Sequence, residues 1–120
     1  YNQGENNTIL SQTTTYRQRF KELFDIYKRD FPGIRRVYAF QIQPQSCTND
    51  ANWVLREVQR NLPSLSPDSI SMLATAGAVL SQDSCHYRSA VTIEWGRRLY
   101  RQIYRDFFNG PSEISFNHPN

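Results

Sequence analysis

Lysines, cysteines and long apolar runs are all scarce in this chain of 120 residues. No stretch approaches the roughly 18 consecutive apolar residues of a membrane-spanning helix, so no membrane partner is expected. The chain has only two cysteines and two histidines, without the Cys-x-x-Cys spacing of a zinc site, so no metal is expected. The net charge of +3 comes from short, separated basic groups such as Arg35-Arg36, which argues against a nucleic-acid partner.

Apolar residues make up 38% of the chain and aromatic residues 13%, which is enough for the core of one small domain or part of one. Residues 1–110 hold the periodic apolar patterns and form the predicted domain. Residues 111–120 contain two prolines and are predicted to be a tail or linker. His118 falls in this tail, so we expect it to be exposed to solvent rather than catalytic.

Three helices and two strands are predicted from the spacing of apolar residues. The helices cover 13–31, 50–61 and 89–109, and the strands cover 37–42 and 70–74. Strands that alternate with helices predict an α/β fold with a parallel sheet, in which ligands bind at the carboxyl ends of the strands. The residues expected to face the core are Tyr16, Phe20, Leu23, Phe24, Tyr27 and Phe31 in the first helix, Val54, Leu55 and Val58 in the second, and Ala90, Ile93, Leu99, Ile103 and Phe107 in the third.

Asp83 and His86 lie three residues apart, just before the last predicted helix. In acyl transfer, a histidine takes the proton of a serine hydroxyl, while a carboxylate fixes the tautomer of the histidine and stabilises the imidazolium that forms. One loop supplies both groups here, so the pair is the candidate acid and base. The alternative is structural, because Asp83 or Ser84 could instead cap the following helix. Tyr87 is given no role in the chemistry.

The N-terminal segment carries a second motif, Gln3-Gly4-Glu5, whose first residue precedes Asp83 by 80 positions. A Gln-Gly-Glu motif followed at this distance by Asp-x-x-His resembles the carbohydrate acetylesterase branch of the SGNH hydrolase superfamily, the sialate O-acetylesterase-like domains. The resemblance covers roughly residues 1–108. Two motifs in the right order are more specific than either motif alone.

The resemblance implies a fold and a set of roles. The fold would be a three-layer, flavodoxin-like parallel sheet, of which residues 1–110 form the C-terminal portion. Gln3 would donate its side-chain amide to the oxyanion and Glu5 would support the motif loop. Asp83 and His86 would be the catalytic acid and base. The substrate would be an acetylated carbohydrate, and no cofactor is expected.

The chain departs from the family pattern at the nucleophile. No Gly-x-Ser elbow follows a predicted strand, so no serine has the strand-to-turn setting that exposes a nucleophile. We therefore expect the serine upstream of Tyr1, in the N-terminal part of the same domain, and expect the isolated chain to be inactive. A noncatalytic carbohydrate-binding or accessory module with the same fold is the alternative. A flavodoxin-like structural domain with chance motifs is the third hypothesis.

Cys47 and Cys85 each fall in a loop after a predicted strand. If both loops lie at one edge of the sheet, these cysteines gather there with Gln3, Asp83 and His86 and can form a disulfide. Two free buried thiols are the alternative. The tyrosine-rich, lysine-poor composition favours the disulfide, and with it a secreted or periplasmic protein.

Overall fold

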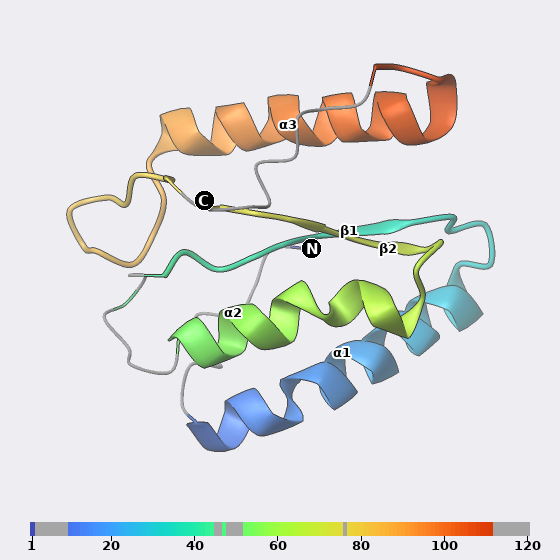
Figure 1. Ribbon diagram of the computed structural model, residues 1–120, viewed down its shortest axis with the longest axis horizontal. Helices are drawn as coiled ribbons and strands as arrows, with labels where there is room; N and C mark the ends of the chain where they lie inside the picture. Colours follow the sequence, from blue (N-terminus) through green and yellow to red (C-terminus); the bar gives the residue numbers. More distant parts are fainter. Residues whose placement is uncertain (2–9, 45–46, 48–51, 76, 112–120) are drawn as a thin grey trace.

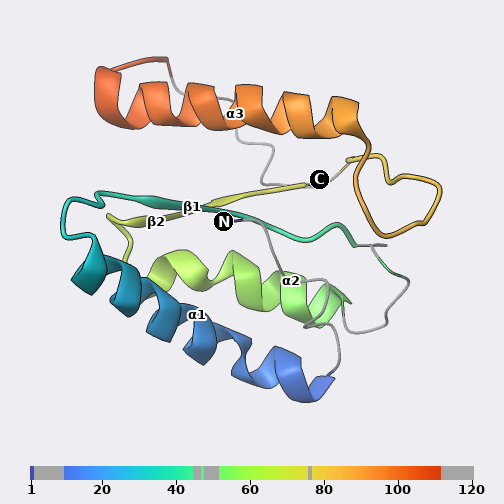
Figure 2. The ribbon, with the colours of Figure 1, turned by 180° about the vertical axis from the view of Figure 1, so that it is seen from behind.

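The computed structural model describes residues 1, 10–44, 47, 52–75 and 77–111. Figure 1 shows the helices and strands that these residues form. They are α1 (Leu10–Asp30), β1 (Val37–Phe40), α2 (Asn52–Arg60), the short 3-10 helix η3 (Leu62–Leu65), β2 (Ile70–Leu73) and α3 (Ser89–Phe108). The views in Figures 1 and 2 agree that α1 and α2 cover one face of the strands and α3 covers the other. Among these helices, none is long and apolar enough to cross a membrane.

The strands β1 and β2 form a parallel pair, in which Val37 is the register partner of Ile70. The other edge of β1 is also hydrogen-bonded. There, the amino group of Tyr1 donates to the carbonyl of Tyr38 over 2.8 Å, and the N–H of Phe40 donates to the carbonyl of Tyr1 over 2.9 Å. This is the bonding pattern between parallel strands, so Tyr1 adds one strand position beside β1.

The main apolar core lies between the sheet and the pair α1 and α2. Aromatic residues recur every four positions along α1, so one side of that helix buries three rings against the strands. Leu55 of α2 and Leu62 of η3, both completely buried, belong to the same layer. The buried members of this core are Tyr16, Phe20, Phe24, Ala39, Ile42, Leu55, Leu62 and Ile70.

A second, smaller aromatic cluster joins α3 to the opposite face of β1. The ring of Phe40 stacks on the buried ring of Trp95, with centroids 5.0 Å apart, and Tyr87 meets Trp95 edge-on at 4.1 Å. Successive side chains of a strand point to opposite faces. Ala39 therefore joins the core beneath α1 and α2, while Phe40 packs against α3.

A polar cluster fixes the second half of α3 to β1. The carboxylate of Asp106 accepts hydrogen bonds from the guanidinium of Arg36 and from the hydroxyl of Tyr38, each over 2.8 Å. Burial is the first cause that raises the pKa of Tyr38 to about 12, followed by its hydrogen bond and charge interaction with Asp106. The same contacts with Tyr38 and the arginines lower the pKa of Asp106 against the opposing effect of burial.

The predicted α/β class with parallel strands is confirmed, but several predicted core positions are wrong. Phe31, Val54 and Ala90 are exposed, and Ile93 has 60% of its surface exposed. The buried residue of α3 is instead Trp95, because the sheet-facing side of this helix is set by the aromatic contact with Phe40. The other apolar residues predicted to face the core from α3, which are Leu99, Ile103 and Phe107, are half-buried.

Candidate active site

The Asp-x-x-His motif lies on a narrow hairpin-like loop between β2 and α3. Leu80 and Tyr87 pair across its base as an antiparallel bridge, and the N–H of Ser81 donates to the carbonyl of His86 over 2.7 Å. Ser84 occupies the tip with a φ of 56°, in the left-handed region that a tight turn requires. These bonds bring the two ends of the motif together before α3 begins.

Asp83 is the centre of the hydrogen bonds within this loop. Its Oδ1 atom accepts the backbone N–H groups of Cys85 and His86, each over 3.0 Å, and also the hydroxyl of Ser81. Its Oδ2 atom lies 2.6 Å from Nδ1 of His86. The Ser81 hydroxyl, then the His86 ring and the two backbone N–H groups, hold the pKa of the Asp83 carboxyl well below its ordinary value. The carboxylate is therefore ionised at neutral pH.

His86 faces solvent. Its side chain is 81% exposed, and that of Asp83 is 50% exposed. The contact through Nδ1 orients the imidazole and favours the tautomer that carries a proton on that nitrogen. Nε2 is then the atom that would take a proton from a nucleophile. The geometry is that of an oriented general base on an open surface.

The loop is tied to the segment that follows β1. A disulfide joins Cys47 to Cys85 with a Cα–Cα distance of 4.2 Å, and the N–H of Cys47 donates to the carbonyl of Ser84 over 2.8 Å. The two cysteines are 38 residues apart in sequence. This cross-link brings the segments after both strands to one edge of the sheet.

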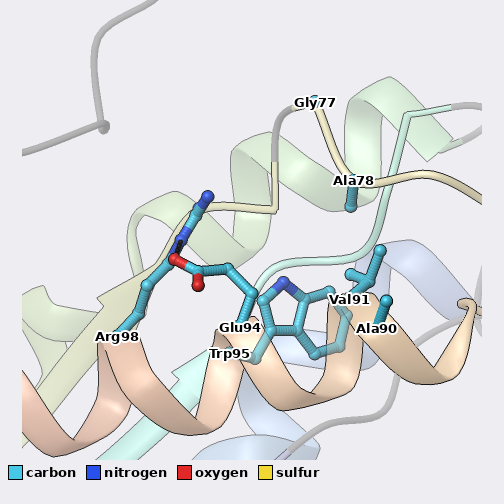
Figure 3. Close-up of a pocket in the computed structure, with 7 residues that line it drawn as sticks. All are labelled: Gly77, Ala78, Ala90, Val91, Glu94, Trp95 and Arg98. Atoms are coloured by element: carbon cyan, nitrogen blue, oxygen red, sulfur yellow. Dashed lines mark hydrogen bonds and ion pairs between the residues drawn. The ribbon is translucent and has the colours of Figure 1, made fainter.

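A pocket of about 210 Å³ lies near the base of the same loop, between the first turns of α3 and the segment after β2 (Figure 3). The ring of Trp95 and small side chains form its wall, and the ion pair between Glu94 and Arg98, with 3.4 Å between Nε and Oε1, lies beside it. Neither Asp83 nor His86 lines this pocket. Its residues are Gly77, Ala78, Ala90, Val91, Glu94, Trp95 and Arg98.

The structure distinguishes between the alternatives for the Asp-x-x-His motif. The helix-capping interpretation is wrong, because α3 begins at Ser89 and its N-cap residue is Arg88, which makes no side-chain cap bond. Asp83 instead accepts hydrogen bonds within the loop that precedes α3. Sequence reasoning overlooked Ser81, whose hydroxyl donates to the carboxylate of Asp83.

The other predicted site residues cannot be placed beside this pair. Gln3 and Glu5 lie outside the described residues, and so does His118 in the predicted tail. Within the described part of the chain, no group of three or more potential ligands could hold a metal ion.

Comparison with known proteins identifies a family. The family model described as carbohydrate esterase, sialic acid-specific acetylesterase, matches residues 1–105. Neither the curated proteins nor the solved structures include a match to this chain.

Proposed function

Because the chain belongs to the sialic acid-specific acetylesterase family of carbohydrate esterases, we propose that it forms part of a serine-type O-acetylesterase that hydrolyses acetyl esters on sugars. The observation that carries this proposal is the 2.6 Å contact between Nδ1 of His86 and Oδ2 of Asp83 on an exposed loop. The loop follows β2, at the carboxyl edge where parallel sheets bind their ligands.

In the proposed mechanism, His86 acts first as general base and then as general acid. Its Nε2 atom takes the proton of a serine hydroxyl as the serine oxygen attacks the acetyl carbonyl. The same proton passes to the sugar oxygen as the ester bond breaks and an acetyl-serine forms. Water then attacks that intermediate by the same route, releasing acetate. Asp83 orients the imidazole and stabilises its positive charge throughout.

The nucleophile and the oxyanion donors complete the proposal. The serine is supplied from upstream of Tyr1, since no Gly-x-Ser elbow follows β1 or β2, the strands of the described residues. Gln3 donates its amide to the oxyanion, as the family motif implies, and Glu5 supports the motif loop. The parallel pairing of Tyr1 with β1 supports a larger sheet of the flavodoxin-like, SGNH type, to which an upstream segment contributes. The disulfide supports a secreted or periplasmic location,.

The competing function is a noncatalytic carbohydrate-binding module, and the absence of a nucleophile elbow in this chain favours it. The two functions differ in what His86 does. An esterase loses turnover when the base is removed, whereas a binding module shows no turnover and has no need of an oriented histidine.

The deciding experiment compares variants of the natural full-length protein on O-acetylated N-acetylneuraminic acid, with acetate release as the readout. We expect wild type to release acetate and His86→Ala to lose at least about 10³-fold in kcat. His118→Ala, which removes the other histidine of the chain, is the matched control and should resemble wild type. Equal rates for wild type and His86→Ala would exclude the proposed mechanism.

A further inference from the structure

The side of α3 that points away from the sheet is aromatic. Tyr104 comes nine residues after the buried Trp95, about two and a half helical turns, so it lies opposite the side that packs on β1,. Tyr100, Tyr104 and Phe108 are 66%, 44% and 65% exposed, and adjacent rings of the three stack with centroids 6.1 Å apart. In both ribbon views, no other helix or strand of the described residues lies beyond this side of α3 (Figures 1 and 2). A row of exposed aromatic rings is typical of a surface that binds a partner.

Four residues on this side of α3 follow the spacing of packed helix pairs. Ile93, Arg97, Tyr100 and Tyr104, here called the outer stripe, are separated by four, three and four positions. This alternation keeps one line of side chains facing a second helix. Ile93 and Arg97 are exposed, as the two tyrosines are. Tyrosine and arginine are also the residues that contribute most to binding at protein interfaces.

The outer stripe is complementary to itself when two copies of α3 pack in opposite directions. A two-fold axis between positions 98 and 99 places Ile93 beside Tyr104 of the second copy,. The same axis places Arg97 beside Tyr100 of the second copy. The first contact is apolar, and the second sets a guanidinium against an aromatic ring, which is a cation–π interaction. The symmetry repeats each contact, so the four residues of one copy meet the four of the other.

The charges beside the outer stripe are complementary as well. Glu94 and Arg101 are seven positions apart, about two helical turns, so they flank the stripe on the same side,. An antiparallel two-fold brings identical flanks together, so Glu94 of each copy meets Arg101 of the other. Within one chain, Oε1 of Glu94 lies 3.4 Å from Nε of Arg98 and 3.5 Å from Nη2 of Arg101. A purely acidic partner would place like charge against Glu94, whereas a second copy supplies both signs.

We propose that the outer stripe is a dimer interface, and that its occupant is α3 of a second copy of this chain in the antiparallel orientation. The planes of the Tyr100 and Tyr104 rings are only 11° apart in the single chain. Because these rings are already ordered, association costs less side-chain entropy. The interface is independent of the proposed esterase function, since no residue of the outer stripe belongs to the loop of Asp83 and His86.

The first arm of the test measures the mass of the natural full-length protein by sedimentation equilibrium at increasing concentration. Wild type should show a monomer–dimer equilibrium. Tyr100→Arg should raise its dissociation constant by about tenfold or more, because a ring is lost and a second guanidinium then faces Arg97 of the other copy. Tyr100→Phe, which keeps the ring, is the matched control and should associate like wild type.

The second arm separates loss of the interface from loss of folding. Glu94→Arg and Arg101→Glu each set like charges against one another across the two-fold axis, so each variant alone should associate at least about tenfold more weakly than wild type. An equimolar mixture should regain the dimer, because the two variants carry opposite charges at the contacting positions. Mixing cannot repair a chain that fails to fold. Variants that stay monomeric when mixed would overturn the antiparallel pairing.

Two further outcomes would overturn the dimer interface. One is a wild-type protein that remains monomeric up to about 1 mM, or that associates no more tightly than Tyr100→Arg. The other is a monomeric wild type that binds phosphatidylserine vesicles and loses this binding in Tyr100→Arg. That result would assign the outer stripe to a lipid surface instead of a second copy.

Discussion

The carboxylate of Asp83 makes two contacts with His86, one to the ring and one to the backbone. Its Oδ2 atom lies 2.6 Å from the ring nitrogen Nδ1, and its Oδ1 atom accepts the backbone N–H of the same residue over 3.0 Å. Both the ring and the main chain of His86 are therefore positioned by one side chain three residues earlier. A carboxylate on the same loop therefore orients the candidate base.

Replacing Asp83 should damage catalysis far more than folding. In the full-length protein, Asp83→Asn should lower kcat on an acetylated sugar by about 10³–10⁴-fold, because an amide no longer stabilises the imidazolium or fixes its tautomer. Asp68→Asn, which changes an exposed aspartate before β2, is a suitable control. A kcat for Asp83→Asn within a few-fold of wild type would contradict the role given to this carboxylate.

The isolated 120-residue chain should be nearly inert toward 4-nitrophenyl acetate. The histidine and serine of such a site act as a unit, and the loss of one costs almost as much as the loss of both. We expect hydrolysis no faster than that of His86→Ala, with activity restored when the upstream segment is present. Turnover by the isolated chain that disappears in His86→Ala would place the nucleophile within these residues, with Ser84, Ser46 and Cys47 the first to test.

The pKa of Asp83 should depend on Ser81. A carbon-detected NMR titration should show a carboxyl pKa well below the ordinary value of about 3.9, and Ser81→Ala should move it upward because the first cause of the shift is removed. The ionised form is favoured by folding. Its stabilising contribution is therefore present above the unfolded pKa and is lost as the pH falls through the folded pKa. An unchanged titration in Ser81→Ala would assign the low pKa to the other three donors.

Removing the cross-link should destabilise the protein. The disulfide closes a separation of 38 residues, so the combined change Cys47→Ala and Cys85→Ala should lower the free energy of unfolding by about 3–4 kcal/mol. Because the bond and the Cys47 N–H both hold the His86 loop, kcat should fall as well. Urea unfolding and acetate release test the two effects, and reduction of the wild-type protein provides an independent comparison. Unchanged stability in both would exclude a structural role for the bond.

Stability should fall as the pH rises from about 10 to about 12. The folded pKa of Tyr38 is raised to about 12 from an ordinary value near 10, so its stabilising contribution is present below the unfolded pKa and is lost as the pH rises through the folded one. Urea midpoints of wild type should drop over this range, and Tyr38→Phe should show a smaller drop. Tyr100→Phe, which changes an exposed tyrosine of α3, should behave like wild type. Identical pH profiles for wild type and Tyr38→Phe would rule out this coupling.

Local sequence patterns were sufficient to predict the order of the three α-helices and the strands β1 and β2, though not η3, and to single out the Asp83 and His86 pair. The helix spanning residues 89–109 and the two strands are recognisable because apolar periodicity reflects the geometry of a few neighbouring residues. The pair is recognisable for the same reason, since three residues of one turn fix the distance between the carboxylate and the ring.

Contacts between segments that are distant in sequence determine which side chains are buried and which groups they contact. Ile93 and Trp95 are both apolar and lie two positions apart, yet Trp95 is the one that is buried, because Phe40 and Tyr87 pack against its ring. Likewise, nothing near Arg56 in the sequence shows that its charge is buried, because its partners Ile42 and Thr75 come from the ends of two different strands. The order of apolar residues along a segment determines which of its side chains could be buried. The packing of that segment against distant segments determines which of them are buried and what they contact.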